Sequence, residues 1–318
     1  MRIGIIGAGT AATMHSRAIQ SLHPEMEQFV FDINPEVAVK FANAHNVICS
    51  SNLHDFWECI DAVVISTPVT THSTFVKEAL RRKKHILCEK PMALNTNEAQ
   101  EMLNMCREYD GVVCSVGFNY RYFAITRLIK ESKLIGEIKN VNLMIRRLYR
   151  NDWHNSYNGV LSDLGIHLID LLFFICNQSI DFSTCTTIMK KKEDWDYDSQ
   201  VSGQMTNGVN FYISASRITN PLEVVFSINI EGEAGSILYD SRQMSKWTLK
   251  KGGIVEVGTF ELSYTTTDFF DFTDSISLQD FFWIKSINNN RNYYNASFED
   301  GLNAQRALDY FIDQATGT

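Results

Sequence analysis

Three residues in two short segments combine a carboxylate, a base and a cation. Asp163 and His167 lie four positions apart in Asp-Leu-Gly-Ile-His, inside an apolar stretch that predicts a helix over residues 161–176. Residues at this spacing share one helix face, so the carboxylate could orient the imidazole; a purely structural helical pair is the alternative. Lys90 lies in Glu-Lys-Pro, directly after the apolar strand 85–88. A neutral imidazole can take a proton near neutral pH, and an ammonium group can stabilise negative charge on oxygen, so this set suits chemistry at an alcohol or carbonyl.

A glycine-rich turn after the first apolar run predicts a dinucleotide site. The turn Gly7-Ala8-Gly9-Thr10-Ala11-Ala12 fits the pattern G-x-G-x-x-G/A between a strand and a helix. The first glycine permits the tight turn, the second lets backbone approach a pyrophosphate, and the small third residue lets the helix pack against the strand. We therefore expect a nicotinamide dinucleotide to contact Gly7, Gly9, Thr10, Ala11 and Ala12.

Two further strand ends extend this expected cofactor site. Asp32 ends the second strand, and no arginine follows it. A carboxylate there can accept hydrogen bonds from the ribose hydroxyls and would repel a 2′-phosphate, so we expect NAD rather than NADP; a helix-capping carboxylate is the alternative. The strand Asp61–Ser66 leads to Thr67, Pro68 and His72, which are expected on the nicotinamide side, although His72 could instead be a surface residue at a helix start.

The two halves of the chain differ in their pattern of elements. Strands and helices alternate up to residue 118, which predicts a doubly wound parallel sheet, the Rossmann-type α/β domain 1–118. Residues 119–318 begin with helices near 125–132 and 161–176 and continue mostly as strands, which predicts an α+β domain with a large, mainly antiparallel open sheet. The expected strands are 139–149, 182–190, 199–205, 210–217, 223–230, 236–239, 247–250 and 255–262, and a last helix is expected at 298–314.

Composition excludes several classes of function. The 318 residues are 45% hydrophobic and 21% charged, with a net charge of -8. We therefore do not expect the chain to bind nucleic acid or anionic lipid, because such binding depends on an excess of Lys and Arg. Seven cysteines without CxxC spacing predict free thiols in a reducing cytoplasm. Eight histidines without HExxH spacing predict no metal site. The apolar runs are too short to cross a membrane, and the chain starts with an apolar strand, so we expect no signal peptide.

These segments together resemble the Gfo/Idh/MocA family, the glucose–fructose oxidoreductase and inositol dehydrogenase family. The resemblance covers essentially the whole chain and rests on the glycine turn, the Thr67-Pro68 strand end, Cys88-Glu89-Lys90-Pro91, the stretch GFNYRYFAITRLIKESKLIGEI, the Asp-x-Gly-x-His helix and the helix start SFEDGLNA. It implies a Rossmann domain and a mixed α/β domain. It also implies a homodimer or homotetramer, because the open sheet of the second domain commonly forms the oligomer interface in this family.

The resemblance also implies roles for single residues. Lys90 matches the active-site lysine of the family, Asp163 its aspartate and His167 its catalytic histidine. It implies hydride transfer between the nicotinamide and a secondary alcohol or ketone of a sugar, cyclitol or sugar derivative, with His167 as the acid/base. Glu89 and Lys90 are expected beside the cofactor as well. The residues expected around the substrate are Asn119, Arg121, Trp153, His154 and Tyr157.

Two other functions could use the same scaffold. Bound NAD could be recycled within one reaction, as in glycoside cleavage by transient oxidation. A non-catalytic sensor could bind the dinucleotide and a partner protein, but it would not require Lys90 and His167. The identity of the substrate, the reaction direction and the oligomer size stay open, because specificity depends on loops of the second domain.

Overall fold

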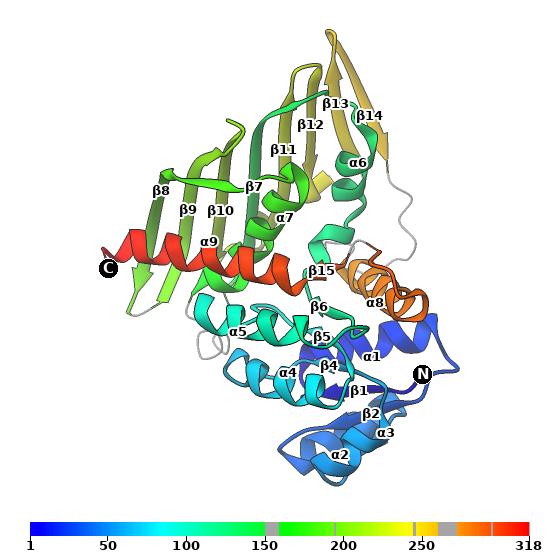
Figure 1. Cartoon of the computed structure of the whole chain (residues 1–318). Helices are drawn as coiled ribbons and strands as arrows, with labels where there is room; N and C mark the ends of the chain where they lie inside the picture. Colours follow the sequence, from blue (N-terminus) through cyan, green and yellow to red (C-terminus); the bar gives the residue numbers. More distant parts are fainter. Residues whose placement is uncertain (150–158, 194, 244–245, 260–271, 294, 318) are drawn as a thin grey trace. The chain divides into compact units, whose positions relative to one another are not determined.

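The computed structural model describes residues 1–149, 159–193, 195–243, 246–259, 272–293 and 295–317 (Figure 1). They form two compact units, Met1–Asn119 with Phe272–Gln305 and Tyr120–Asp271 with Arg306–Thr318. The division falls inside the last helix. The domain limits expected from the sequence, 1–118 and 119–318, stay a prediction.

The first unit is built on a sheet with the strand order β15-β6-β5-β4-β1-β2-β3 (Figure 1). Its strands are β1 (Ile3–Ile6), β2 (Gln28–Phe31), β3 (Ile48–Cys49), β4 (Ala62–Ile65), β5 (His85–Cys88), β6 (Cys114–Val116) and β15 (Ala296–Ser297). Strands β1 to β6 pair in parallel, and β15 runs antiparallel to β6. The helices are α1 (Thr10–Leu22), α2 (Pro35–His45), α3 (Leu53–Cys59), α4 (His72–Arg81), α5 (Thr96–Arg107), α8 (Phe272–Asn289) and the first part of α9 (Phe298–Thr316).

Helices cover both faces of this sheet because alternate side chains of β1 face opposite layers. Ile3 and Ile5 belong to a buried cluster that also contains Ile19 of α1 and Trp283 of α8. On the other face, a Cβ at Gly4 would overlap the ring of Phe56 in α3, so the helix packs directly on the strand backbone. The doubly wound sheet expected from the alternating sequence is therefore confirmed.

The second unit is built on a sheet with the strand order β14-β13-β12-β11-β7-β10-β9-β8 (Figure 1). Its strands are β7 (Ile138–Leu148), β8 (Ile180–Lys192), β9 (Trp195–Met205), β10 (Asn210–Ile218), β11 (Val225–Gly232), β12 (Gly235–Asp240), β13 (Lys246–Lys251) and β14 (Ile254–Thr259). β7 and β10 pair in parallel, and the other neighbours are antiparallel. The expected mainly antiparallel sheet is thus confirmed.

Two helices precede most of these strands, α6 (Ala124–Ser132) and α7 (Ile166–Cys176). α7 packs on β7 and β10, and its side chains Leu168, Ile169 and Leu171 are fully buried. A helix that is apolar on nearly all sides must be enclosed by protein. Polar side chains at the start of α7 are therefore expected in the interior of the second unit.

The structure departs from the expected elements at several places. The sequence patterns did not predict α3 or α8, nor the short strands β3 and β15. The helix expected from residue 161 begins instead with a π-helical segment, Leu161–Gly165, before α7. The strand expected over 255–262 is present as β14 up to Thr259, and its last three residues lie outside the described residues. Among the described residues, no helix is both long and apolar enough to span a bilayer.

Candidate active site

The glycine turn joins β1 to α1 and leaves the helix start open. Gly7 has φ +89°, and a Cβ there would lie 2.8 Å from the Ser66 carbonyl oxygen, so only glycine fits. A Cβ at Gly9 would meet nothing within 4 Å, so the fold itself leaves room at this position. α1, all of which is described, has neither a side-chain cap nor an acidic residue in its first turn. The first backbone N–H groups of α1 and the open space at Gly9 therefore fit a pyrophosphate.

The rest of the turn and Asp32 support the same fit. Thr10 and Ala11 begin α1 at its accessible end, whereas Ala12 is fully buried against the sheet, as the small third position requires. Asp32 follows β2, and its carboxylate accepts hydrogen bonds from the backbone N–H of Ala8 at 2.9 Å and of Asn34 at 2.9 Å. Asp32 therefore supports the turn itself, and each of its oxygens retains a second lone pair for a hydroxyl donor.

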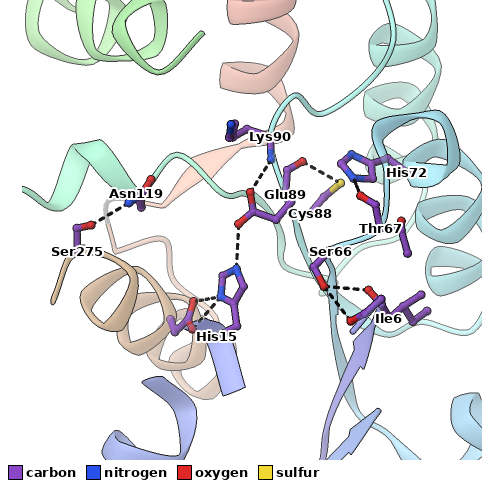
Figure 2. A network of polar contacts seen from close by, with 12 residues as sticks. Ile6, His15, Ser66, Thr67, His72, Cys88, Glu89, Lys90, Asn119 and Ser275 are labelled. Atoms are coloured by element: carbon purple, nitrogen blue, oxygen red, sulfur yellow. Dashed lines mark hydrogen bonds and ion pairs between the residues drawn. The ribbon is translucent and has the colours of Figure 1, made fainter. Parts of the chain in front are cut away.

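His72 connects the ends of two neighbouring strand segments. Its Nδ1 lies 2.9 Å from the Pro91 carbonyl oxygen. Its Nε2 lies 2.8 Å from the Thr67 carbonyl oxygen (Figure 2). The side chain is buried, and this burial lowers its pKa. His72 is thus an internal residue rather than the surface residue that the sequence left as an alternative. Pro68, next to Thr67, is exposed at this strand end.

Glu89 and Lys90 follow β5 within the first unit. The Lys90 amide donates to Glu89 Oε2 at 3.1 Å, and Glu89 Oε1 lies 2.9 Å from His15 Nε2 (Figure 2). His15 Nδ1 lies 2.9 Å from both carboxyl oxygens of Asp280 in α8. We call Asp280, His15 and Glu89 the His15 triad. The bond between Lys90 and Pro91 is cis.

The second unit holds Asp163 in the π-helical segment and His167 in the first turn of α7. Both residues are 4% exposed. Asp163 forms an ion pair with Arg217 of β10, and the His167 ring stacks on Tyr120 with centroids 4.2 Å apart and planes 10° apart. π-Helical turns occur frequently at functional sites. The structure therefore supplies a buried carboxylate and a buried imidazole at the start of one helix.

A third carboxylate anchors this helix start. Asp196 of β9 accepts hydrogen bonds from the Leu161 amide at 2.9 Å and from the Ser199 hydroxyl at 2.5 Å. Gly159 has φ +140°, and a Cβ there would overlap Asp196. Burial raises the pKa of Asp196. Asp196 thus replaces a conventional cap and fixes where the segment carrying Asp163 begins.

Two of the five residues expected around the substrate are described by the structure, one in each unit. Asn119 is buried in the first unit and donates to the Ser275 hydroxyl at 2.8 Å (Figure 2). Arg121 is buried in the second unit and binds both oxygens of Asp170, at 2.8 and 2.5 Å. Arg121 therefore has a structural partner that the sequence did not predict. Trp153, His154 and Tyr157 lie outside the described residues.

The sequence patterns missed His15, Asp280 and Arg217. His15 lies in a helix that was predicted, but nothing in its own segment points to a carboxylate 265 positions away. Asp280 interrupts the apolar sequence LQDFFWI, and an acidic residue in such a run is a signal for a buried partner. Within the described ranges, no group of three or more His, Cys, Asp or Glu side chains could hold a metal ion.

Family models match both parts of the chain. The model described as an oxidoreductase family with an NAD-binding Rossmann fold matches residues 1–118. The model of the GFO/IDH/MocA C-terminal domain matches residues 123–238. The two matches correspond to the parallel sheet of the first unit and to most of the second sheet.

Known proteins agree with these matches. The chain is 29% identical to glucose-6-phosphate 3-dehydrogenase of Bacillus subtilis, over 98% of this chain and 96% of that protein. It is 30% identical to inositol 2-dehydrogenase of Rhizobium meliloti, over 68% of this chain and 69% of that protein. A structure of levoglucosan dehydrogenase with NADH and levoglucosan superposes with a TM-score of 0.89 at 19% identity, covering 100% of this chain and 97% of the other. The chain belongs to the Gfo/Idh/MocA family of NAD-binding oxidoreductases.

Proposed function

We propose that this chain is an NAD-dependent dehydrogenase or reductase of a secondary alcohol or ketone in a sugar, a cyclitol or a sugar derivative. The observation that carries the proposal is the buried pair at the start of α7, Asp163 and His167, in a member of this oxidoreductase family. A helix start does not need a buried imidazole and a buried carboxylate for its own stability, because burying such groups costs free energy unless they are paired.

His167 acts as the acid/base in this proposal. In the oxidation direction its imidazole takes the proton of the substrate hydroxyl, and in reduction it returns that proton to the ketone oxygen. The stacked Tyr120 ring fixes the plane of the imidazole, which aims its nitrogens. Asp163, held by its ion pair with Arg217, lies four positions before His167, where its carboxylate would help to orient the imidazole.

Lys90 binds the reacting oxygen. Its ammonium group stabilises the negative charge that develops on this oxygen as the proton leaves. When bound, the nicotinamide supplies the acceptor for the hydride of the same carbon, or its donor in the reverse direction. The residues that would hold the dinucleotide are the glycine turn, Asp32, the Thr67–Pro68 strand end with His72, and Glu89 and Lys90.

NAD is the preferred cofactor over NADP in this proposal. Asp32 lies at the end of β2, and its two oxygens already orient the backbone of the glycine turn. A 2′-phosphate beside this carboxylate would be repelled, whereas ribose hydroxyls would donate to it. An Asp32→Ala variant should therefore lose affinity for NAD much more than for NADP.

The substrate class follows the named relatives. One is a dehydrogenase of glucose 6-phosphate and another of inositol, so we propose a polyhydroxylated ring as the substrate of this chain. Asn119, Arg121, Trp153, His154 and Tyr157 remain the proposed substrate contacts. For Arg121 such a contact would have to coexist with the Asp170 ion pair.

Location and assembly are part of the same proposal. All seven cysteines lie in the described residues and all are free thiols, which suits a reducing cytoplasm. We propose that a homodimer or homotetramer forms through the sheet of the second unit. Sedimentation of the purified protein would measure the oligomer size.

A direct assay tests the proposal. The purified protein is mixed with NAD or NADP and with glucose 6-phosphate, myo-inositol, levoglucosan and related polyols. Formation of NADH or NADPH is followed by absorbance. We expect turnover of at least one ring polyol with NAD. His167→Ala should lower kcat roughly 100- to 10,000-fold, the range typical for loss of an acid/base group. Lys90→Ala should also lose turnover.

Two exposed residues provide matched controls for these variants. His54 in α3 and Lys40 in α2 are exposed and lie outside the proposed site, so His54→Ala and Lys40→Ala should keep the wild-type rate. Unchanged rates in His167→Ala and Lys90→Ala would refute the assigned roles. Substrate conversion without net reduction of NAD would favour the recycling alternative instead.

A further inference from the structure

His15 is enclosed between two acidic groups in the interior of the first unit. The imidazole and the Asp280 carboxyl group are fully buried, and the Glu89 side chain is 16% exposed. The three groups come from α1, from α8 and from the segment after β5. The His15 triad therefore connects three elements that are far apart in the sequence.

The geometry of the His15 triad favours a cation at its centre. A carboxylate only accepts hydrogen bonds, so each ring nitrogen must donate a proton to an ionised carboxylate, and only the imidazolium can donate at both positions. Burial alone would lower the pKa of His15, but Asp280 and Glu89 raise it to about 10. Burial opposes ionisation of Glu89 as well, yet His15 lowers the pKa of that carboxyl group.

Two further contacts hold the Glu89 carboxylate. Its second oxygen, Oε2, accepts the backbone N–H of Lys90 at 3.1 Å. A Cβ at Gly117 would lie 3.0 Å from Glu89 Oε1, so the carboxyl group packs against a residue that offers no side chain. Figure 2 shows His15, Glu89 and the Lys90 backbone as a continuous chain of hydrogen bonds.

We propose that His15 and Asp280 are positioning residues, which hold Glu89 in one orientation and thereby fix the backbone from which Lys90 projects. The inference rests on the proposed function, since it needs Lys90 and Glu89 to contact the cofactor or the reacting oxygen. It adds two fully buried residues, His15 of α1 and Asp280 of α8, which are not among the proposed cofactor or substrate contacts. A shift of about 1 Å in a positioned group can reduce rates roughly 100-fold, so such support has kinetic consequences.

A merely structural role is the alternative, and two properties separate it from positioning. A structural ion pair would change the unfolding temperature but not the properties of the folded protein. A positioning role changes the affinity for NAD and the value of kcat/KM at temperatures where the variant is fully folded. The dissociation constant for NAD, measured by calorimetry, does not depend on turnover.

The variants are His15→Gln and Asp280→Asn, with His45→Gln as the matched control. His45 is a buried histidine of the same unit that packs against Phe41 and lies outside the proposed site. Glutamine cannot donate to both carboxyl groups as an imidazolium does. Asparagine has the size of aspartate and keeps one acceptor oxygen, but it has no charge. If His15→Gln does not fold, the test therefore uses Asp280→Asn.

We expect the two triad variants to bind NAD about tenfold more weakly and to lower kcat/KM roughly 10- to 100-fold. His45→Gln should match the wild type in both. The inference is overturned if a folded triad variant keeps both values, or if His45→Gln loses as much. If the wild-type protein oxidises no polyol, the proposed function fails, while the NAD affinities still decide whether the His15 triad positions Glu89.

Discussion

Each unit buries an acidic residue, but the two units neutralise it with different cations. In the His15 triad the cation is an imidazolium. In the second unit Arg121 binds both oxygens of Asp170, and both side chains are almost fully buried. An imidazole can lose its proton within an accessible pH range, whereas a guanidinium group cannot. The cation of the His15 triad can therefore lose its charge as pH rises, whereas the cation of the arginine pair stays charged.

The two clusters also differ in how they respond when the cation or its partner is lost. The His15 triad has two carboxyl groups for one cation, and burial raises the pKa of Asp280, so this group can take up a proton. In the second unit the buried Arg121 guanidinium binds both oxygens of Asp170, and Arg121 cannot become neutral. Damage to the arginine pair should therefore cost more stability than damage to the triad.

The largest effect is expected for Asp170→Ala. The substitution leaves the buried Arg121 guanidinium without its bidentate partner, and breaking such a pair typically costs about 3–5 kcal/mol. Chemical unfolding followed by circular dichroism measures this loss. The double variant Arg121→Leu with Asp170→Leu should recover most of it, because no buried charge remains. A cost below about 1 kcal/mol for Asp170→Ala would contradict the assigned burial of the pair.

His15→Gln is expected to cost somewhat less, about 3 kcal/mol. It removes the central cation, but Asp280 can become protonated instead of remaining as a buried anion. Adding Asp280→Asn to His15→Gln should restore part of the stability. The comparison between the two clusters breaks down if His15→Gln costs more than Asp170→Ala in the same unfolding assay.

The pH dependence of stability is the next effect in size. The pKa of His15 rises from 6.5 to about 10 on folding, so the folded protein binds a proton that the unfolded chain releases. The resulting stabilisation is complete below the unfolded pKa and is lost as pH rises towards the folded value. Between about pH 6.5 and pH 8.5 the wild type should lose about 2 kcal/mol of unfolding free energy.

At about pH 8.5 three thiols whose pKa values are raised by burial begin to add a loss of the same sign, Cys88, Cys176 and Cys185. His15 therefore dominates the lower part of this window. Asp280 and Glu89 are the charged groups that face His15, and Asp280, whose pKa is also raised, acts with the same sign. The pKa values of His45, His72 and His85 are lowered by burial. Their contribution to the free energy of unfolding therefore rises with pH only at and below the ordinary histidine range. His15→Gln should remove most of the slope between about pH 6.5 and pH 8, and an unchanged slope in this variant would assign the effect elsewhere.

Periodicity and turn chemistry were sufficient to predict most of the fold. The alternation of apolar strands with helices predicted the parallel sheet, and Gly7 was recognisable because a positive φ and close packing require glycine. α8 was missed because its buried stripe, residues 276, 279, 280, 283 and 284, contains a glutamine and an aspartate. These two polar residues interrupt the helical spacing of apolar residues, so the pattern did not indicate a helix. One of them is Asp280 of the His15 triad.

The site was predictable only where its residues are local in sequence. Asp163 and His167 are four positions apart, so one segment was enough to propose them. Their partners could not be found in this way, because Arg217 comes from a strand 54 positions later and the π-helical start changes which side chains are neighbours. Pairing across such distances is decided by packing, which a single sequence does not display.

The smallest effect sharpens the contrast between buried and exposed charge. Lys77 of α4 pairs with Glu101 of α5 at 3.0 Å, and the two side chains are 33% and 66% exposed. Water screens such a pair, so Lys77→Ala should change the unfolding free energy by about 0.5 kcal/mol or less. Moderate salt should remove even this difference, while the cost of Asp170→Ala should persist, because buried pairs are screened much less. Equal salt sensitivity of the two variants would mean that burial does not separate these pairs.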